Sequence, residues 1–283
     1  MRCLEYTVTA ENDGTTVETL LHANGIGRRL TVRLKQTPDG LCVAGQRVHS
    51  TRVLHAGETL CVTLPAPESA TTHGDIPVLY RDDDIIVCNK PAGLPCHRSG
   101  GHRHDTLEDA VGEYPLRIVG RLDKDTSGIV VLARNQLAAS RLHGRIEKHY
   151  LAVAGGTLPD GEGDIVLPLE RAAAYEPLQI VTPDGAPCRT HYRVLWHGQG
   201  MSLVLCTPVT GRMHQIRAHL AAVGAPLLGD ALYGGDCGAI KRQALHCRDV
   251  TFLHPFGGEL LSFSAPLPQD IASLLPADAL TGV

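Results

Sequence analysis

The sequence predicts an α+β fold, in which a larger domain built on a mainly antiparallel sheet with flanking helices follows a small α/β domain. Strand-like and helical patterns follow one another without regular β–α alternation, which favours an antiparallel sheet over a parallel one. The strand-like runs lie at 84–88, 129–133, 149–154, 178–181, 192–195, 201–206 and 259–263. The helical patterns lie at 105–112, 136–147 and 212–223. Small and polar residues at 66–75 predict a linker, so the expected domains are 1–65 and 76–283.

The first domain has its own pattern of elements. Thr16–His22 and the basic segment Arg28–Gln36 predict two short helices, and strands with their turns are expected over 41–48 and 56–64. Two helices followed by a small sheet resemble an RNA-binding domain shared with a ribosomal small-subunit protein. The alternative interpretation is a β-rich extension of the larger domain.

Length and composition fit a folded intracellular chain. The 283 residues can bury a large core. No apolar run approaches the ~20 residues of a membrane helix, so we expect no membrane partner. Met1–Tyr6 lacks the basic and apolar regions of a secretory signal. Nine cysteines without a Cys-x-x-Cys pair are typical of reduced thiols, which predicts a cytoplasmic location.

The charge distribution allows nucleic-acid contacts only locally. A net charge of −4 argues against a chain that is basic throughout. The segment 27–35, however, holds four cations and no anion, and we expect these side chains to contact phosphates. They are Arg28, Arg29, Arg33 and Lys35. Further cations recur at helical spacing at Arg141, Arg145 and Lys148.

The most informative stretch is Gly120–Gly128, a polar turn that leads into the apolar run 129–133. Its sequence is G-R-L-D-K-D-T-S-G. The turn places Asp123 beside a rigid core strand, where a carboxylate can act as a nucleophile or a base. Arg121, two residues earlier, can meet a phosphate or a flipped base. The alternative is an N-capping Asp with a solvated Arg.

This stretch resembles the R-L-D-x-x-T-S-G signature of the RluA-type pseudouridine synthases. That family usually has His where Gly120 stands, and Gly occurs there in the related RsuA type. Lys148–Val153 resembles the K-x-Y-x-A block of the family, and Gly211–Leu220 resembles its G-R-T-H-Q-I-R-x-H-L block with Met213 in place of Thr. Both blocks favour the RluA type. The resemblance covers roughly residues 76 to 270.

The resemblance implies a role for each matching residue. Asp123 would be the catalytic residue, Tyr150 would stack on the uracil, and Arg217 would form a buried ion pair with Asp123. A core aromatic residue and a surface arginine are the alternatives for Tyr150 and Arg217. Contacts to the substrate are expected from Arg121, Leu122, Thr126, Lys148 and Gln215, and from the cations of 27–35.

No metal or cofactor is expected. His97, His102 and His104 lie in a Gly-rich segment without ligands at zinc-site spacing. His214 and His219 are five residues apart, which does not suit a zinc helix. The acidic run 82–84 predicts a solvated turn rather than a magnesium site.

The implied reaction is the isomerisation of uridine to pseudouridine in structured RNA, with ribosomal RNA or tRNA as the partner. The N1–C1′ bond breaks, the uracil turns, and C5 bonds to C1′, so no group donor is required. The sequence leaves open whether Asp123 attacks the ribose or the base, or acts as a base. We expect a monomer. The alternatives are an RsuA-type synthase with another RNA target and a non-catalytic RNA-binding protein of the same fold.

Overall fold

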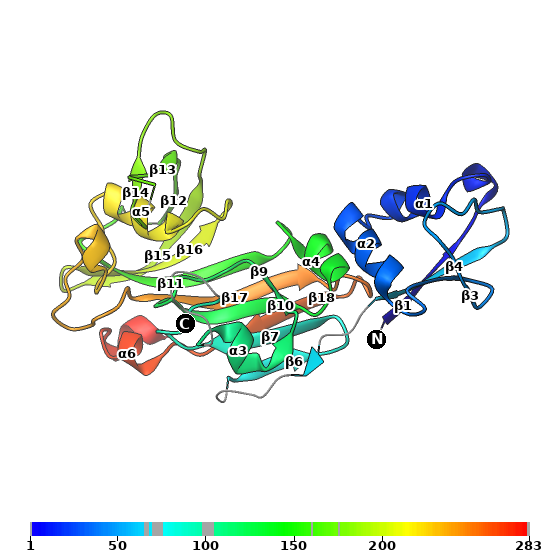
Figure 1. The fold of residues 1–283 in the computed structure, drawn as a ribbon. Coiled ribbons are helices and arrows are strands. Elements are labelled where there is room, and N and C mark those ends of the chain that lie inside the picture. The colour runs from blue at the N-terminus through cyan, green and yellow to red at the C-terminus, as the bar shows by residue number, and fades with distance from the viewer. Residues whose placement is uncertain are drawn as a thin grey trace.

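A ten-stranded sheet runs through the larger part of the computed structural model, which describes residues 2–64, 68–69, 76–97, 105–159, 161–174 and 176–281 (Figure 1). Its strands are β6 (Val78–Arg81), β7 (Ile85–Lys90), β9 (Arg117–Val119), β10 (Ser127–Ala133), β11 (Glu147–Gly155), β12 (Glu162–Ile165), β15 (Thr190–Gly198), β16 (Met201–Pro208), β17 (Leu245–Leu253) and β18 (Leu260–Ser264). They lie in the order β12-β15-β16-β11-β17-β10-β7-β6, with β18 beside β17 and β9 beside β10. The predicted α+β fold with a mainly antiparallel sheet is confirmed.

One pair in the sheet is parallel. Strands β10 and β17 pair through Ser127 with His246 and Gly128 with Cys247. Gly128 has φ +118, and a Cβ there would lie 2.2 Å from the Cys247 carbonyl oxygen. Only glycine can bring the two backbones this close.

Short helices and ribbons complete the larger part. They are α3 (Leu107–Val111), α4 (Gln136–Leu142), α5 (Gln215–Ala222), α6 (Gln269–Ala272), the 3-10 helices η2 (Ala231–Tyr233) and η3 (Ala277–Leu280), and the ribbons β13 (Leu169–Arg171) with β14 (Gln179–Val181) and β5 (Glu68–Ser69) with β8 (Glu113–Tyr114). None of the helices in the described ranges has the length and apolar character needed to cross a membrane.

All three helices predicted in the larger part are shorter than expected, and α3 covers only Leu107–Val111 of the predicted 105–112. Helix α4 ends at Leu142 because Gly144 turns the chain with φ +70. Lys148 therefore lies on β11, and the expected helical spacing with Arg141 and Arg145 is wrong. Helix α5 begins at Gln215 rather than at residue 212, because the chain before it forms a turn.

The core lies on both faces of the sheet. Along β11, Tyr150 and Ala152 join the main cluster on one face, whereas Leu151 and Val153 join a second cluster that includes Ile271 of α6. Every residue of β10 is buried. The turn before β10 is therefore attached to a rigid element.

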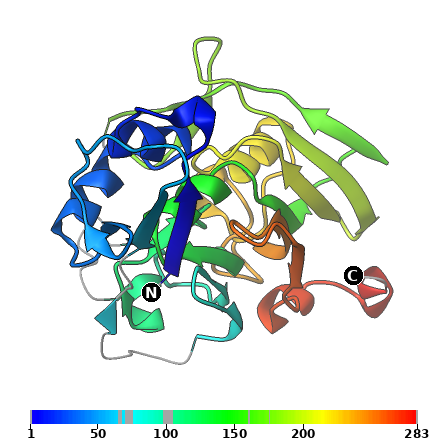
Figure 2. The same ribbon diagram turned by 90° about the vertical axis from the view of Figure 1, so that its right-hand side faces the viewer.

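Residues 2–64 form a separate four-stranded sheet with two helices. The strands β1 (Arg2–Thr7), β2 (Leu41–Val43), β3 (Gln46–Arg47) and β4 (Thr59–Leu64) lie in the order β1-β4-β2-β3. The helices are α1 (Val17–Ala23) and α2 (Arg28–Gln36), preceded by the 3-10 helix η1 (Ala10–Asn12). This N-terminal unit has its own hydrophobic cluster, which also takes in Leu137 of α4. The unit lies at the α4 end of the molecule, and α5 lies at the other end (Figures 1 and 2).

Candidate active site

Asp123 lies on the turn between β9 and β10, and its carbonyl accepts a hydrogen bond from the Thr126 N–H at 3.1 Å. Its side chain is 27% exposed. The expectation of a buried carboxylate is therefore wrong. Partial exposure suits a group that has to meet a substrate.

Arg217 makes the predicted contact with Asp123. Its Nη1 donates to Oδ2 of Asp123 at 3.1 Å. Its Nε and Nη2 donate to both oxygens of Asp230 at 2.7 and 2.8 Å, and the guanidinium carbon lies 5.1 Å from the centre of the Tyr233 ring. The bidentate partner Asp230, 1% exposed, was not among the predicted site residues. Arg217 is thus oriented mainly by a carboxylate other than Asp123.

A fully buried lysine, Lys90, is hydrogen-bonded to the turn that carries Asp123. Nζ of Lys90 donates to the carbonyls of Pro91, Leu94 and Lys124 at 2.8–2.9 Å. Burial lowers the pKa of Lys90 to about 8. Sequence reasoning missed this residue, because Lys90 ends β7 after the polar Asn89 and lysine is rarely buried unless its charge is paired.

A second buried lysine holds the start of the turn. Lys148 Nζ donates to the Gly120 carbonyl, and burial lowers the pKa of Lys148. Gly120 has φ +72, and a Cβ there would lie 2.8 Å from that Nζ. Glycine at this position is therefore explained by both its backbone angle and the lysine beside it.

Three other expected substrate contacts also have internal partners. Leu122 lies in the main core, Thr126 accepts from Gln243 Nε2 at 3.1 Å, and Gln215 bonds to Thr210 and Thr190 through its amide. All three side chains are buried. Their contact with a substrate stays a prediction, and their visible role is to shape the loops around Asp123.

Tyr150 has the surroundings of a core aromatic residue, with 7% of its surface exposed. Burial raises the pKa of Tyr150 well above its usual value, and Cys247 and the Asp123 charge act in the same direction. The influence of Asp123 means that the tyrosine lies within electrostatic range of that carboxylate. Stacking on a uracil stays a prediction.

The predicted cations lie in two places. Arg121 is exposed beside the turn, and its Nη1 lies 3.2 Å from His97 Nε2. Helix α2 carries Arg28, Arg33 and Lys35, while the Arg29 side chain lies outside the described residues. The N-terminal unit packs near the end of β10, whereas Asp123 precedes its start, and seven strand residues span roughly 23 Å. The structure therefore does not bring these α2 cations to Asp123.

The acidic run at 82–84 is not the expected solvated turn. The ligand atoms of Asp82, Asp84 and His254 lie within 4.8 Å of one another. Asp84 is 1% exposed and bonds to Arg2 and to Asn135 Nδ2, while Asp82 Oδ2 lies 2.9 Å from His254 Nε2. Arg2 already neutralises Asp84, so the cluster acts as a link between the N-terminal unit and the sheet.

Histidines considered for a metal have other partners. His219 bonds to Thr190 Oγ1 and the Leu167 carbonyl, both at 2.9 Å. His214 lies between Asp123 and Tyr233. The pair His102 and His104 lies outside the described residues.

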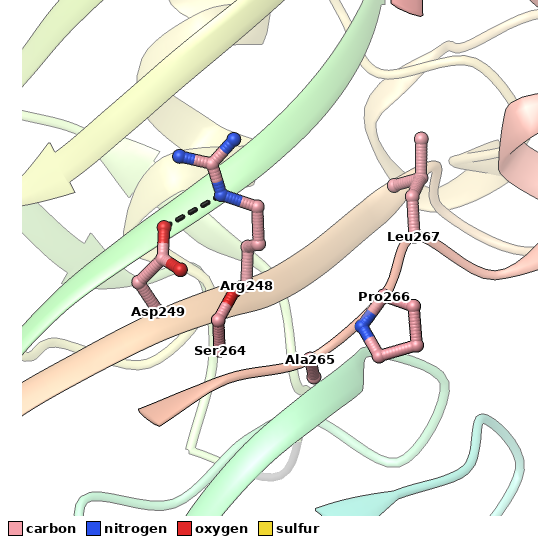
Figure 3. A pocket seen from close by; sticks show the side chains of 6 residues that line it. All are labelled: Arg248, Asp249, Ser264, Ala265, Pro266 and Leu267. Carbon is pink, nitrogen blue, oxygen red and sulfur yellow. Dashed lines mark hydrogen bonds and ion pairs between the residues drawn. The ribbon is translucent and has the colours of Figure 1, made fainter. Parts of the chain in front are cut away.

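A pocket of about 270 Å³ lies elsewhere, at β17 and the segment after β18 (Figure 3). It is lined by Arg248, Asp249, Ser264, Ala265, Pro266 and Leu267. In the wall of this pocket, Nε of Arg248 donates to Oδ2 of Asp249 at 2.6 Å. Since neither Asp123 nor Arg217 lines it, this pocket is distinct from the candidate active site.

Comparison with known proteins connects this geometry to one family. Residues 84–222 match a family model described as RNA pseudouridylate synthase. The RNA pseudouridine synthase YjbO of Bacillus subtilis is 34% identical over 90% of this chain and 96% of its own length. Ribosomal large subunit pseudouridine synthase D of Nitrosomonas europaea is 35% identical over 78% of this chain and 72% of its own length.

The fold has solved counterparts. Human RNA pseudouridylate synthase domain containing 1 superimposes with a TM-score of 0.56 at 27% identity, covering 74% of this chain and 96% of that one. Human RNA pseudouridylate synthase domain containing 4 superimposes with a TM-score of 0.53 at 23% identity, covering 69% of this chain and 90% of that one. The second likeness concerns the fold alone.

Proposed function

This chain belongs to the RNA pseudouridine synthases, and we propose that its substrate is a uridine in the RNA of the large ribosomal subunit. The enzyme is an isomerase that acts on RNA, as the RluA-type resemblance implies. Relatives from Nitrosomonas europaea, Xanthomonas campestris and Haemophilus influenzae, 35–37% identical, are named for the large subunit. Their names support ribosomal RNA over tRNA.

The observation that carries the catalytic assignment is the partly exposed Asp123 carboxylate beside a buried arginine. Arg217 donates a hydrogen bond to this carboxylate and so orients it for either nucleophilic attack or base catalysis. Arg121, two residues before Asp123, is exposed and can contact the RNA backbone or fill the gap left by a flipped uridine. Tyr150 would support the uracil.

The N-terminal unit is proposed as a second RNA contact. Its described α2 cations, Arg28, Arg33 and Lys35, lie too far from Asp123 to touch the reacting uridine, and we propose that they contact phosphates elsewhere in the RNA together with Arg29. Burial is the largest cause that lowers the pKa of Arg117 on β9, and the charge of Arg33 lowers this pKa further. Like charges held near each other favour a phosphate between them. We also propose the domains 1–65 and 76–283, joined by the linker 66–75, of which the structure describes only Glu68 and Ser69, in strand β5.

We further propose that the enzyme acts as a cytoplasmic monomer without metal or cofactor. The product is an isomer of the substrate, so the reaction consumes no oxidant and no group donor. The large-subunit names of the relatives support a cytoplasmic location.

Release of tritium from RNA labelled at C5 of uridine tests the assignment, because C5 loses its hydrogen when it bonds to C1′. We expect Asp123→Asn to abolish release while RNA binding and folding persist, since an amide neither attacks nor accepts a proton as a carboxylate does. Asp125→Asn, the same change two residues along, is the matched control. Turnover by Asp123→Asn within tenfold of wild type would exclude the role of Asp123.

Mapping pseudouridines in cells that lack the protein tests the substrate. We expect one or more positions of large-subunit ribosomal RNA to remain uridine. Loss of a tRNA position with intact ribosomal RNA would overturn the proposed substrate but not the reaction.

A further inference from the structure

Two side chains approach the same oxygen of the Asp123 carboxylate. Arg217 Nη1 donates to Oδ2 at 3.1 Å, and His214 Nε2 lies 3.8 Å from that same oxygen. Within the described part of the chain, no donor bonds to Oδ1 of Asp123. A carboxylate held by one oxygen keeps the lone pairs of the other available. Oδ1 is therefore the oxygen that can meet the substrate.

The position of the His214 proton follows from Tyr233. The Tyr233 hydroxyl accepts from the Gln179 backbone N–H at 2.9 Å and lies 3.2 Å from Nδ1 of His214. A phenol has one proton to donate, and Nδ1 is the acceptor that the described residues offer it. From this network we assign the neutral tautomer of His214 with its own proton on Nε2, facing Asp123.

The local backbone is built to place this ring. His214 has φ +52 and ψ +18, the left-handed region that a non-glycine residue rarely adopts, and its side chain is 11% exposed. The turn is held by Gln215, whose Oε1 accepts from Thr210 Oγ1 and the Arg212 N–H. Strained residues that the surroundings hold in place are concentrated at functional sites.

The charges around the ring favour its neutral form. Burial is the largest cause that lowers the pKa of His214, and Arg217 acts in the same direction. Asp123 and Asp230 act in the opposite direction without reversing the shift. Tyr233 completes the titratable surroundings, and its pKa is raised by burial.

We propose that His214, oriented by Tyr233, is a positioning residue that fixes Oδ2 of Asp123 together with Arg217 and so presents Oδ1 to the uridine. The proposal rests on Asp123 being the reactive group. At 3.8 Å the contact is longer than a hydrogen bond, and catalytic contacts of this kind tighten when the substrate binds. Because Gln179 belongs to β14, the β13–β14 ribbon is coupled through Tyr233 to the orientation of Asp123.

The test compares His214→Ala, His214→Gln and Tyr233→Phe by tritium release, RNA binding and thermal unfolding. Ala and Gln carry the same positive-φ strain, but only Gln keeps an N–H that can reach Asp123. We expect His214→Ala to lower kcat about 10–100-fold with KM within about threefold, as a misplaced reacting group does. His214→Gln should recover part of that loss. Tyr80→Phe, which removes a hydroxyl bond to Asp82, is the control.

The split between kcat and KM separates positioning from a merely structural role. In Tyr233→Phe no described residue donates to Nδ1, so the His214 ring is less well oriented and kcat should fall with KM little changed. Wild-type kcat in His214→Ala, a change in KM alone, or wild-type kcat in a folded Tyr233→Phe would overturn the proposal. An active Asp123→Asn would instead refute the proposed catalytic role of Asp123, so the two failures are distinguishable.

Discussion

Replacing Arg217 with alanine would leave the Asp230 carboxylate buried without its cation. Asp230 is 1% exposed and would lose both of its charge-assisted hydrogen bonds, at 2.7 and 2.8 Å. Breaking a buried pair from one side costs about 3–5 kcal/mol. Asp123 is 27% exposed, so solvent screening limits the contribution of the Arg217–Asp123 contact to stability to at most about 1 kcal/mol. We expect the free energy of unfolding to fall by about 3–5 kcal/mol, most of it through Asp230.

The same variant should lose catalysis through Asp123. Loss of one hydrogen bond between charged groups corresponds to about 10–100-fold in rate. Arg217→Lys should restore only part of it, because an ammonium lacks the planar fork of donors that two carboxylates share here.

A double variant separates the two effects. Arg217→Met with Asp230→Leu removes both buried charges, so we expect stability to return to within about 2 kcal/mol of wild type. Catalysis should stay as low as in Arg217→Ala, because Asp123 still lacks its arginine. Urea unfolding and tritium release measure the two quantities. A stability loss below about 1 kcal/mol in Arg217→Ala, or recovered catalysis in the double variant, would refute the reasoning.

Acid should destabilise the protein through His246, which is fully buried and whose pKa burial lowers from 6.5 to about 4. The unfolded chain then binds a proton that the folded chain does not, so up to about 3 kcal/mol of stability is lost as the pH falls from 6.5 towards 4. Urea unfolding should show a shallower pH dependence in His246→Asn, and equal slopes would count against this explanation. Gly120→Ala should cost about 1–3 kcal/mol in urea unfolding, through positive φ and the contact with Lys148. Gly144→Ala, with similar φ and open space, should cost only about 1 kcal/mol, and equal losses would mean that the lysine contact does not matter. Deleting residues 1–70 should leave a folded larger domain whose RNA binding is weaker and less dependent on salt, and an unchanged salt slope would exclude contact through α2.

Apolar runs predicted six of the ten strands of the sheet and missed β6, β9, β12 and β17. Each predicted run overlaps a strand of the structure, since continuous apolar stretches and β-branched residues suit a buried strand. In β17, however, His246, Arg248 and Asp249 interrupt the apolar pattern. His246 is buried all the same, because it bonds to Ser127 Oγ and the Ala265 carbonyl. Hydropathy cannot reveal a polar core residue whose partners are distant in sequence.

The candidate site was predictable to the extent that its residues lie in motifs. The ion pair between Asp123 and Arg217 followed from the resemblance, and the structure places the two side chains in contact. The bidentate partner Asp230 and the cage around Lys90 were missed, because neither spacing nor charge specifies which buried groups will meet. The opposite error occurred at Asp84. Three adjacent acidic residues predicted an exposed turn, but the Asp84 carboxylate is buried in an ion pair with Arg2.

The parallel pairing of β10 with β17 has a consequence for folding kinetics. The strands on the two sides of this pairing come from consecutive stretches of the chain, 78–133 and 147–264. Strands β10 and β17 themselves are joined through just two residue pairs. Pairings between residues so distant form late, because loop closure has to precede them. Asp123 belongs to the first stretch and Arg217 to the second. During refolding, enzymatic activity should therefore return after the spectroscopic signal of the strands, with a delay set by this closure.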